Sequence, residues 1–232
     1  MLILGMDTST PRLALGLRLC GETLAVRHVR PESRPAEIIL DELDALLRKA
    51  GVGMDAVQGI AVGLGPGSFT GLRVGAATAQ GLAQARGIPL AGVSSFRTMA
   101  AAAGDGPVLV VEDARRGQWY GAVYRRAPAC ERPILQEGLY DAGTLTARLP
   151  SDTACVTGPG AHLFSAELET AGIEIPRILT GEAAYPSADV LIGLAEDPLR
   201  RGGETPENLV PNYIRRTQAE ETRRARAGER SS

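Results

Sequence analysis

The chain has 232 residues, of which 44% are hydrophobic and 22% are charged, and its formal net charge is −2. This composition is typical of a soluble globular protein that builds one large core or two smaller ones. No apolar run approaches the roughly 20 residues that span a bilayer. The near-neutral charge gives no overall basic footprint for nucleic acid.

The cysteines and histidines indicate the cellular compartment and argue against disulfide bonds and a metal site. The three cysteines, Cys20, Cys130 and Cys155, are odd in number and scattered, which favours reduced cytosolic thiols over a disulfide framework. The N-terminus has no basic region before its apolar run, so no signal peptide is evident. The two histidines, His28 and His162, are far apart and lack ligand-like neighbours. We expect a cytoplasmic protein without a metal site, in which each histidine is a surface or structural residue.

The N-terminal segment predicts a three-stranded antiparallel meander. Residues 1–6 form a continuous apolar run that ends at Asp7, as expected of a strand buried on both faces. Leucines then alternate from residue 13 to residue 19, and a tight connection leads into a third strand over residues 23–29. The first turn of this meander contains Asp7, Thr8, Ser9 and Thr10.

Two helices with a strand between them follow. The first covers residues 35–50 and has one apolar face that includes Ile39, Leu43 and Leu46. A short apolar strand over residues 57–63 then enters a glycine-rich turn, and Ser68 is the predicted N-cap of the second helix, 68–86. The turn resembles a phosphate cradle, but it contains no lysine where a Walker loop requires one.

The second helix carries two rows of small residues. The first is Gly71, Gly75, Ala79, Ala83 and Gly87, at every fourth position, and the second is Ala77, Gly81 and Ala85. Such rows form ridges along a helix, and interior glycines cost roughly 1 kcal/mol each, so close approach of another backbone is expected. That backbone belongs either to the chain's own sheet or to a second chain. The sequence leaves both open.

The second half of the chain repeats the pattern of the first. Residues 104–107 are the densest turn signal and predict a boundary between an N-terminal lobe, 1–105, and a C-terminal lobe, 106–202. After it, an apolar strand ends at Asp113, as the first strand ends at Asp7. The repeat predicts an α/β fold of the actin, Hsp70 and sugar-kinase type, with duplicated ribonuclease H-like ββ-meanders and helices around a cleft.

The C-terminal part is less regular. A last helix over residues 187–201 could return to pack on the first lobe. Residues 203–232 are predicted to form an extended tail that is mostly disordered, with anchoring apolar residues confined to 209–214.

Three residues at the cleft are candidates for binding a nucleotide. Asp7, Thr8 and Asp113 would lie at strand ends, where related kinases hold Mg²⁺ and phosphate. The second strand-end turn, however, continues as Ala114-Arg115-Arg116 rather than as a glycine-rich loop. Asp7 and Asp113 therefore either organise turns and contacts between the lobes or belong to a vestigial nucleotide cleft. Arg115 and Arg116, beside Trp119 and Tyr120, could grip phosphate or stack on RNA bases, but a solvated turn or an intramolecular salt bridge is the commoner explanation for such a pair.

Four stretches carry a resemblance to a known family. They are Ile3–Thr10, the block Gly65-Pro66-Gly67-Ser68-Phe69-Thr70-Gly71-Leu72-Arg73, Asp113–Tyr120 and Pro211–Arg215. In this order they resemble the TsaB (YeaZ) family, the dimerisation subunits of the bacterial tRNA threonylcarbamoyladenosine modification complex. The glycine-rich block is the most specific. Many relatives carry a histidine just before the first helix, where this chain has Glu32-Ser33-Arg34.

The resemblance implies a non-catalytic subunit without a cofactor. Its implied partners are the catalytic paralogue TsaD, the ATPase TsaE and, through the complex, tRNA; a homodimer is implied when the chain is alone. Helices 35–50 and 68–86 would pack against the partner as half of a four-helix bundle. The predicted contacts on them are Ile39, Leu43, Leu46, Phe69, Gly71, Leu72, Gly75, Ala76, Ala79 and Ala83.

The alternative function is an ATP-dependent phosphotransferase of the sugar- or acetate-kinase type, in which Asp7 or Asp113 would position Mg²⁺. Nucleophilic catalysis finds little support, since the sequence has no Gly-x-Ser-x-Gly elbow.

Overall fold

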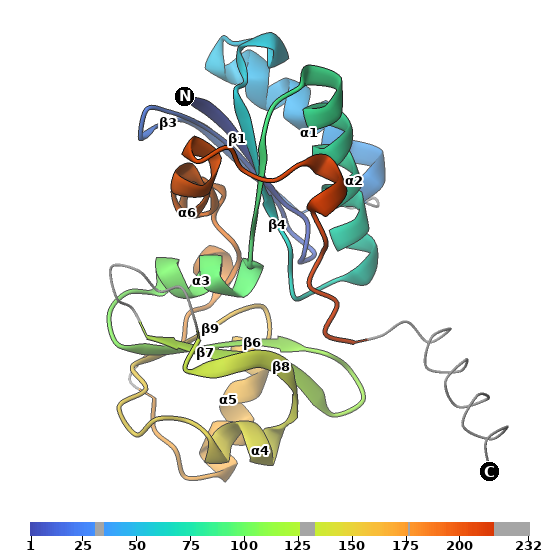
Figure 1. Cartoon of the computed structure of the whole chain (residues 1–232). Helices are drawn as coiled ribbons and strands as arrows, with labels where there is room; N and C mark the ends of the chain where they lie inside the picture. The colour runs from blue at the N-terminus through green and yellow to red at the C-terminus, as the bar shows by residue number, and fades with distance from the viewer. Residues whose placement is uncertain (31–34, 126–132, 176, 216–232) are drawn as a thin grey trace, which may run out of the picture.

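A computed structural model of the chain describes residues 1–30, 35–125, 133–175 and 177–215. It shows two lobes, each built on one mixed sheet (Figure 1). The predicted two-lobed α/β fold with duplicated meanders is confirmed. Among the described residues, no helix combines the length and the apolar character that a membrane crossing needs.

The first lobe has a five-stranded sheet in the order β3-β2-β1-β4-β5. Its strands are β1 (Leu2–Asp7), β2 (Leu13–Leu19), β3 (Glu22–Val29), β4 (Gly59–Gly63) and β5 (Leu90–Val93). The first three form the predicted antiparallel meander, and β4 pairs parallel with both β1 and β5. The apolar runs of β1 and β4 are buried throughout because helices cover both faces of the sheet.

Helices α1 (Pro35–Ala50) and α2 (Phe69–Arg86) cover one face of this sheet (Figure 1). The apolar positions of α1 recur at helical spacing and enter the core formed with β1, β2 and β4. The short 3₁₀ helix η1 (Met54–Ala56) precedes β4, and Ser68 is the N-cap of α2, accepting a hydrogen bond from the Gly71 backbone.

Helix α6 (Ala188–Arg200) returns from the second half of the chain and covers the other face of the first sheet. Gly5 and Gly16 pair across β1 and β2 beneath it, and a Cβ on either would meet Ile192 or Ala188 of the helix. Two glycines thus let the helix backbone approach the sheet closely.

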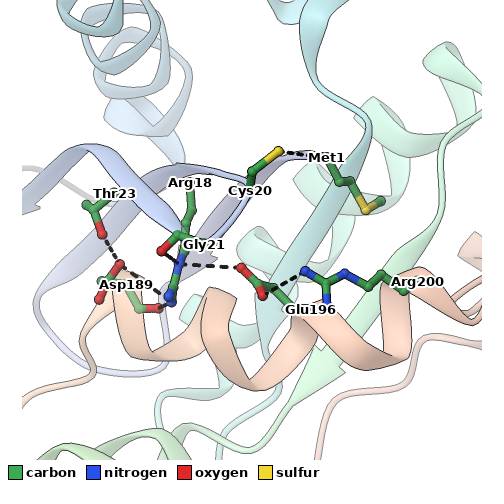
Figure 2. A network of polar contacts seen from close by, with 8 residues as sticks. All are labelled: Met1, Arg18, Cys20, Gly21, Thr23, Asp189, Glu196 and Arg200. Carbon is green, nitrogen blue, oxygen red and sulfur yellow. Dashed lines mark hydrogen bonds and ion pairs between the residues drawn. The ribbon is translucent and has the colours of Figure 1, made fainter.

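Polar contacts fix α6 along the β2–β3 hairpin (Figure 2). The Arg18 guanidinium lies 3.4 Å from a Glu196 carboxylate oxygen and 3.8 Å from one of Asp189, and it donates to the Gly21 carbonyl. Thr23 donates to Asp189, so both strands of the hairpin are tied to one helix.

The second lobe has a four-stranded sheet in the order β8-β7-β6-β9. Its strands are β6 (Pro107–Asp113), β7 (Gln118–Arg125), β8 (Leu135–Asp141) and β9 (Cys155–Thr157). Helix α3 (Ser95–Ala103) packs on one face, and α4 (Ala142–Ala147) and α5 (Ala161–Thr170) pack on the other. The packing of α3 therefore groups it with the second sheet, although the sequence predicted the boundary at 105/106.

Residues 203–215 pack along both lobes, including the segment 209–214 in which anchoring apolar residues were predicted (Figure 1). Glu204 pairs with Leu90 at the edge of the first sheet, and the 3₁₀ helix η3 (Pro206–Asn208) leads to Leu209, which is buried in the first core. The Arg215 guanidinium then donates to the Ala114 carbonyl and the Gln118 side chain in the second lobe. We call residues 204–215 the strap. The expectation for residues 216–232 lies outside the described residues.

Candidate functional site

The row Gly71, Gly75, Ala79 and Ala83, here called the inner row, faces the chain's own first sheet and its first turn. A Cβ on Gly71 would overlap the Thr8 carbonyl oxygen, and one on Gly75 would overlap the Thr8 hydroxyl. The Thr8 hydroxyl donates to the Gly71 carbonyl at 2.7 Å. The glycines are therefore needed where α2 crosses the turn after β1.

This packing corrects the predicted partner contacts residue by residue. Nine of the ten are buried within the chain: Ile39, Leu43, Leu46, Gly71, Leu72, Gly75, Ala76, Ala79 and Ala83. The backbone that the inner row approaches is the chain's own, one of the two possibilities that the sequence left open. Phe69, the tenth, is half-buried.

The second small row of α2 has the opposite environment. Ala77, Gly81 and Ala85 are exposed, and together with the exposed Arg73 they form a line at every fourth residue that we call the outer row. A Cβ on Gly81 would meet no described atom within 4 Å. On α1, Leu40 is 61% exposed and also points away from the core. Small and apolar groups thus lie on the outer surfaces of both helices.

An aromatic cluster borders the outer row at the start of α2. The Arg73 guanidinium lies 4.0 Å from the centroid of the Phe69 ring, and the Phe69 and Tyr213 ring centroids are 5.2 Å apart. Tyr213 belongs to the strap, so the C-terminal segment adds an aromatic side chain to the surface of α2. Aromatic residues and arginine dominate the energetics of protein interfaces.

Asp7 is fully buried at the end of β1. One carboxylate oxygen accepts a hydrogen bond from the Ser9 backbone at 2.8 Å, and the other accepts one from the Ser95 hydroxyl at 2.6 Å. Burial raises the pKa of Asp7, and the hydrogen bonds from Ser9 and Ser95 oppose that rise. The carboxylate thus organises its own turn and ties α3 to the end of β1.

Asp113 organises the equivalent turn of the second lobe. It accepts hydrogen bonds from the Arg115 backbone at 2.7 Å and from the Arg115 guanidinium at 3.4 Å. The three predicted nucleotide-binding residues, Asp7, Thr8 and Asp113, all form hydrogen bonds within the chain. Among the residues that the structure describes, no three His, Cys, Asp or Glu side chains come together as a metal site would require.

Glu112, which precedes Asp113 at the end of β6, is a titratable residue that the sequence analysis missed. Burial, followed by the charges of Asp7 and Asp113, raises the pKa of Glu112 to about 8. Its Oε2 atom is buried and finds no hydrogen-bond partner in the part of the chain that the structure describes. The alternation of β6 offered a signal, because Glu112 shares the face of Val108 and Val110, which is the face toward α3.

The predicted RNA-stacking group is separated by the structure. Arg115 and Arg116 are exposed in the turn, with positive φ angles of 67° and 60°. Trp119, however, is buried, and its ring meets Phe164 edge-on with centroids 5.0 Å apart. The indole is therefore part of the second core, while Arg115 pairs with Asp113 in an exposed turn, which agrees with the solvated turn and intramolecular salt bridge.

Comparison with known proteins gives consistent results. Residues 32–222 match the family model described as "TsaD: tRNA N6-adenosine threonylcarbamoyltransferase". A Haemophilus influenzae protein named "tRNA threonylcarbamoyladenosine biosynthesis protein TsaB" is 30% identical over 227 residues, covering 92% of this chain and 93% of that protein. The Escherichia coli protein of the same name is 38% identical over 130 residues, covering 54% of this chain and 56% of that protein.

Solved structures agree with the sequence matches. A Pseudomonas aeruginosa crystal structure, titled as an uncharacterized protein with similarity to peptidase YeaZ, superposes with a TM-score of 0.79 at 27% identity. The superposition covers 92% of this chain and 99% of that one. A second structure, titled YeaZ from the same organism, gives a TM-score of 0.76 at 28% identity, covering 91% and 99%.

Proposed function

The chain belongs to the TsaB (YeaZ) family and takes part in tRNA threonylcarbamoyladenosine biosynthesis, and we propose that it does so as a non-catalytic subunit. In this role it binds the catalytic paralogue TsaD through the outer surfaces of α1 and α2. Threonylcarbamoyl transfer to the adenosine beside the anticodon then takes place on the partner.

Gly81 is the observation that carries this proposal. An interior helical glycine costs about 1 kcal/mol relative to alanine, and the inner row accounts for its glycines by contact with Thr8. Gly81 has no such contact among the described residues, because a Cβ there meets none of their atoms within 4 Å. Close approach of a helix from another chain is a physical reason to keep a glycine at an exposed helix position.

The surroundings of Gly81 suit the same purpose. Ala77 and Ala85 continue the outer row on either side, and Arg73 with Phe69 supplies a larger anchor at one end. Because α1 and α2 lie side by side on one face of the sheet, their outer surfaces present two helices to a partner (Figure 1). Two such helices from each subunit would form the four-helix bundle that the family resemblance implies.

The arrangement at the cleft supports a non-catalytic role. The Asp7 carboxylate and the Thr8 hydroxyl are held by Ser9, Ser95 and Gly71 of the same chain. A nucleotide or Mg²⁺ at this point would have to displace those hydrogen bonds. We further propose that TsaE and tRNA meet this subunit through the assembled complex, and that the outer row forms a homodimer when TsaD is absent.

The experiment is a stoichiometry-resolving mass measurement of the chain, alone and with TsaD, using Gly81→Leu. Leucine fits in open space and has the better helix propensity, so the variant should stay folded and gain up to about 1 kcal/mol of stability. Its bulk should nevertheless weaken the heterodimer at least about tenfold, because helix backbones could no longer approach at the outer row.

The matched control is Ala166→Leu, which enlarges an exposed position of α5 on the second lobe and should leave the heterodimer intact. Unchanged TsaD affinity in Gly81→Leu would remove the outer row from the interface. If the wild-type chain failed to bind TsaD and hydrolysed ATP by itself, the phosphotransferase alternative would replace the proposal.

A further inference from the structure

Three basic side chains converge where β2 and β3 meet the second lobe. The β2–β3 register ends with the pair Leu13 and Val29, so Arg12 and Arg30 flank the end of the ladder, and both line one cavity with His28. Alternate residues of a strand share a face, which places His28 and Arg30 on the same side of the hairpin. Two arginines that line one cavity repel each other, and a histidine beside them adds to the cost once it is protonated.

The segment around the 3₁₀ helix η2 (Gly181–Ala184) closes this basic group into a cavity of about 420 Å³. The cavity is lined by Pro11, Arg12, His28, Arg30, Gly181, Glu182 and Tyr185. The η2 segment is tied to the second sheet by a hydrogen bond from the Thr157 hydroxyl to the Ala183 carbonyl at 3.3 Å. One wall of the cavity therefore comes from each lobe.

Arg12 is preorganised in this cavity. Its side chain is 14% exposed, it is paired with Glu182, and its guanidinium lies 5.8 Å from the centroid of the Tyr185 ring. The Thr10 hydroxyl exchanges hydrogen bonds with the Arg12 backbone and holds the residue at the end of its turn. Glu182, by contrast, is 80% exposed, so its carboxylate can be displaced by another anion at small cost.

His28 forms part of the cavity wall. Its Nε2 atom is closed to solvent and has no hydrogen-bond partner among the residues that the structure describes. Burial, and then the Arg12 guanidinium, lower the pKa of His28, while Glu182 opposes that shift. An anion in the cavity would lie beside the imidazole and would favour its charged form.

We propose that the cavity between Arg12, His28 and Arg30 binds the phosphoryl group of a small phosphomonoester, with the Glu182 carboxylate occupying part of that position in the free protein. A phosphomonoester fits because its two charges and three terminal oxygens match two guanidinium groups and one imidazole. The volume lies within the roughly 300–1,000 Å³ of small-molecule sites, so the ligand carries an organic group beside its phosphate.

This inference goes beyond the proposed function and does not depend on it. The site is on the opposite face of the hairpin from α1, since Ala25 packs in the α1 core and His28 is displaced from it by an odd number of residues. Binding at the site can therefore be measured on the isolated chain, whether or not TsaD binds elsewhere.

The test is calorimetric titration of the full chain with inorganic phosphate and with AMP, followed by NMR of the His28 ring. Arg30→Gln should weaken binding of both about tenfold through the loss of one charge-assisted contact. Glu182→Gln should tighten binding several-fold, because it removes the competing carboxylate. Both residues are exposed, so both variants should remain folded.

The matched control is His162→Gln. His162 is the other histidine, and it lines a neighbouring cavity that shares Gly181 and Tyr185 with the proposed site. The variant should leave phosphate affinity unchanged, and the His28 ring should titrate at higher pH with phosphate than without it. The proposal would be overturned if Arg30→Gln and Glu182→Gln left phosphate affinity unchanged, or if phosphate did not shift the pH at which the His28 ring titrates. Equal binding of a short RNA without terminal phosphates would overturn the assignment to a phosphomonoester.

Discussion

The turns that follow β1 and β6 occupy the same place in the two lobes but have different environments. The first, Asp7-Thr8-Ser9-Thr10, is buried at every residue and is crossed by α2 and α3. The second, at Arg115 and Arg116, projects into solvent as a hairpin with positive φ angles. The strand-end turn is thus buried in the core in one lobe and exposed at the surface in the other. Substitutions in the two turns should differ accordingly.

The largest expected effect comes from breaking the first turn's contact with α2. Gly75→Leu places a branched side chain against Thr8, which is buried, and should lower the free energy of unfolding by at least about 3 kcal/mol. Chemical denaturation measures this directly. The comparison variant is Gly81→Leu on the same helix, which should be at least as stable as wild type. Equal stability of the two variants would contradict the packing of the inner row.

Removing the aspartate carboxylate should destabilise the protein more in the first turn than in the second. Asp7→Ala leaves the Ser9 backbone N–H and the Ser95 hydroxyl buried without their acceptor, and should cost about 2 kcal/mol of unfolding free energy. Asp113→Ala should cost less than about 1 kcal/mol, since its partner Arg115 is exposed and can bind water. Similar losses in both variants would mean that the two turns contribute alike.

The pKa of Glu112 responds to both turns, because the charges of Asp7 and Asp113 both raise it. Its pKa is raised from 4.5 to about 8 in the folded protein, so between these values the folded state holds a proton that the unfolded state has released. This contribution is fully present below pH 4.5 and is lost as the pH rises toward 8. Glu112→Gln should therefore stabilise the protein more at pH 8 than at pH 5. Denaturation curves at both values test this, and an equal effect at both would contradict the shift.

The smallest effect belongs to the exposed turn. Arg116 has a left-handed backbone with φ of 60°, which costs a residue with a side chain about 1–2 kcal/mol, whereas glycine adopts it freely. Glycine's greater freedom in the unfolded chain offsets part of this gain. Arg116→Gly should thus raise the free energy of unfolding by about 0.5 kcal/mol, measurable as a small rise in Tm. A loss of stability would show that the Arg116 side chain makes a stabilising contact.

Much of the fold could be predicted because its signals are local. Leucine alternation located β2, the apolar runs located β1 and β4, and Ser68 marked the start of α2. The direction of each small-residue row could not be predicted. Both rows repeat every four residues, and their spacing carries no information about which one meets Thr8.

The remaining site residues depend on contacts that are distant in sequence. Arg12, His28 and Glu182 come together only through the register of β2 with β3 and the return of residue 181 to that hairpin. The sequence placed the anchoring apolar residues of the tail at 209–214, and Leu209 is buried, but it did not indicate the two hydrogen bonds from Gln80 to strap carbonyl oxygens. The composition of a segment does not predict which distant residues it will contact.

The return of α6 to the first sheet has a consequence for how the chain folds during synthesis. One face of that sheet, including Ile3, Ala61 and Val93, is covered by residues 191–199 of α6. When only the first hundred residues have emerged from the ribosome, α6 has not yet been made, so one apolar face of this sheet is still exposed to water. The first lobe can complete its core only after the second lobe has been made, so the two lobes cannot mature one after the other as independent units.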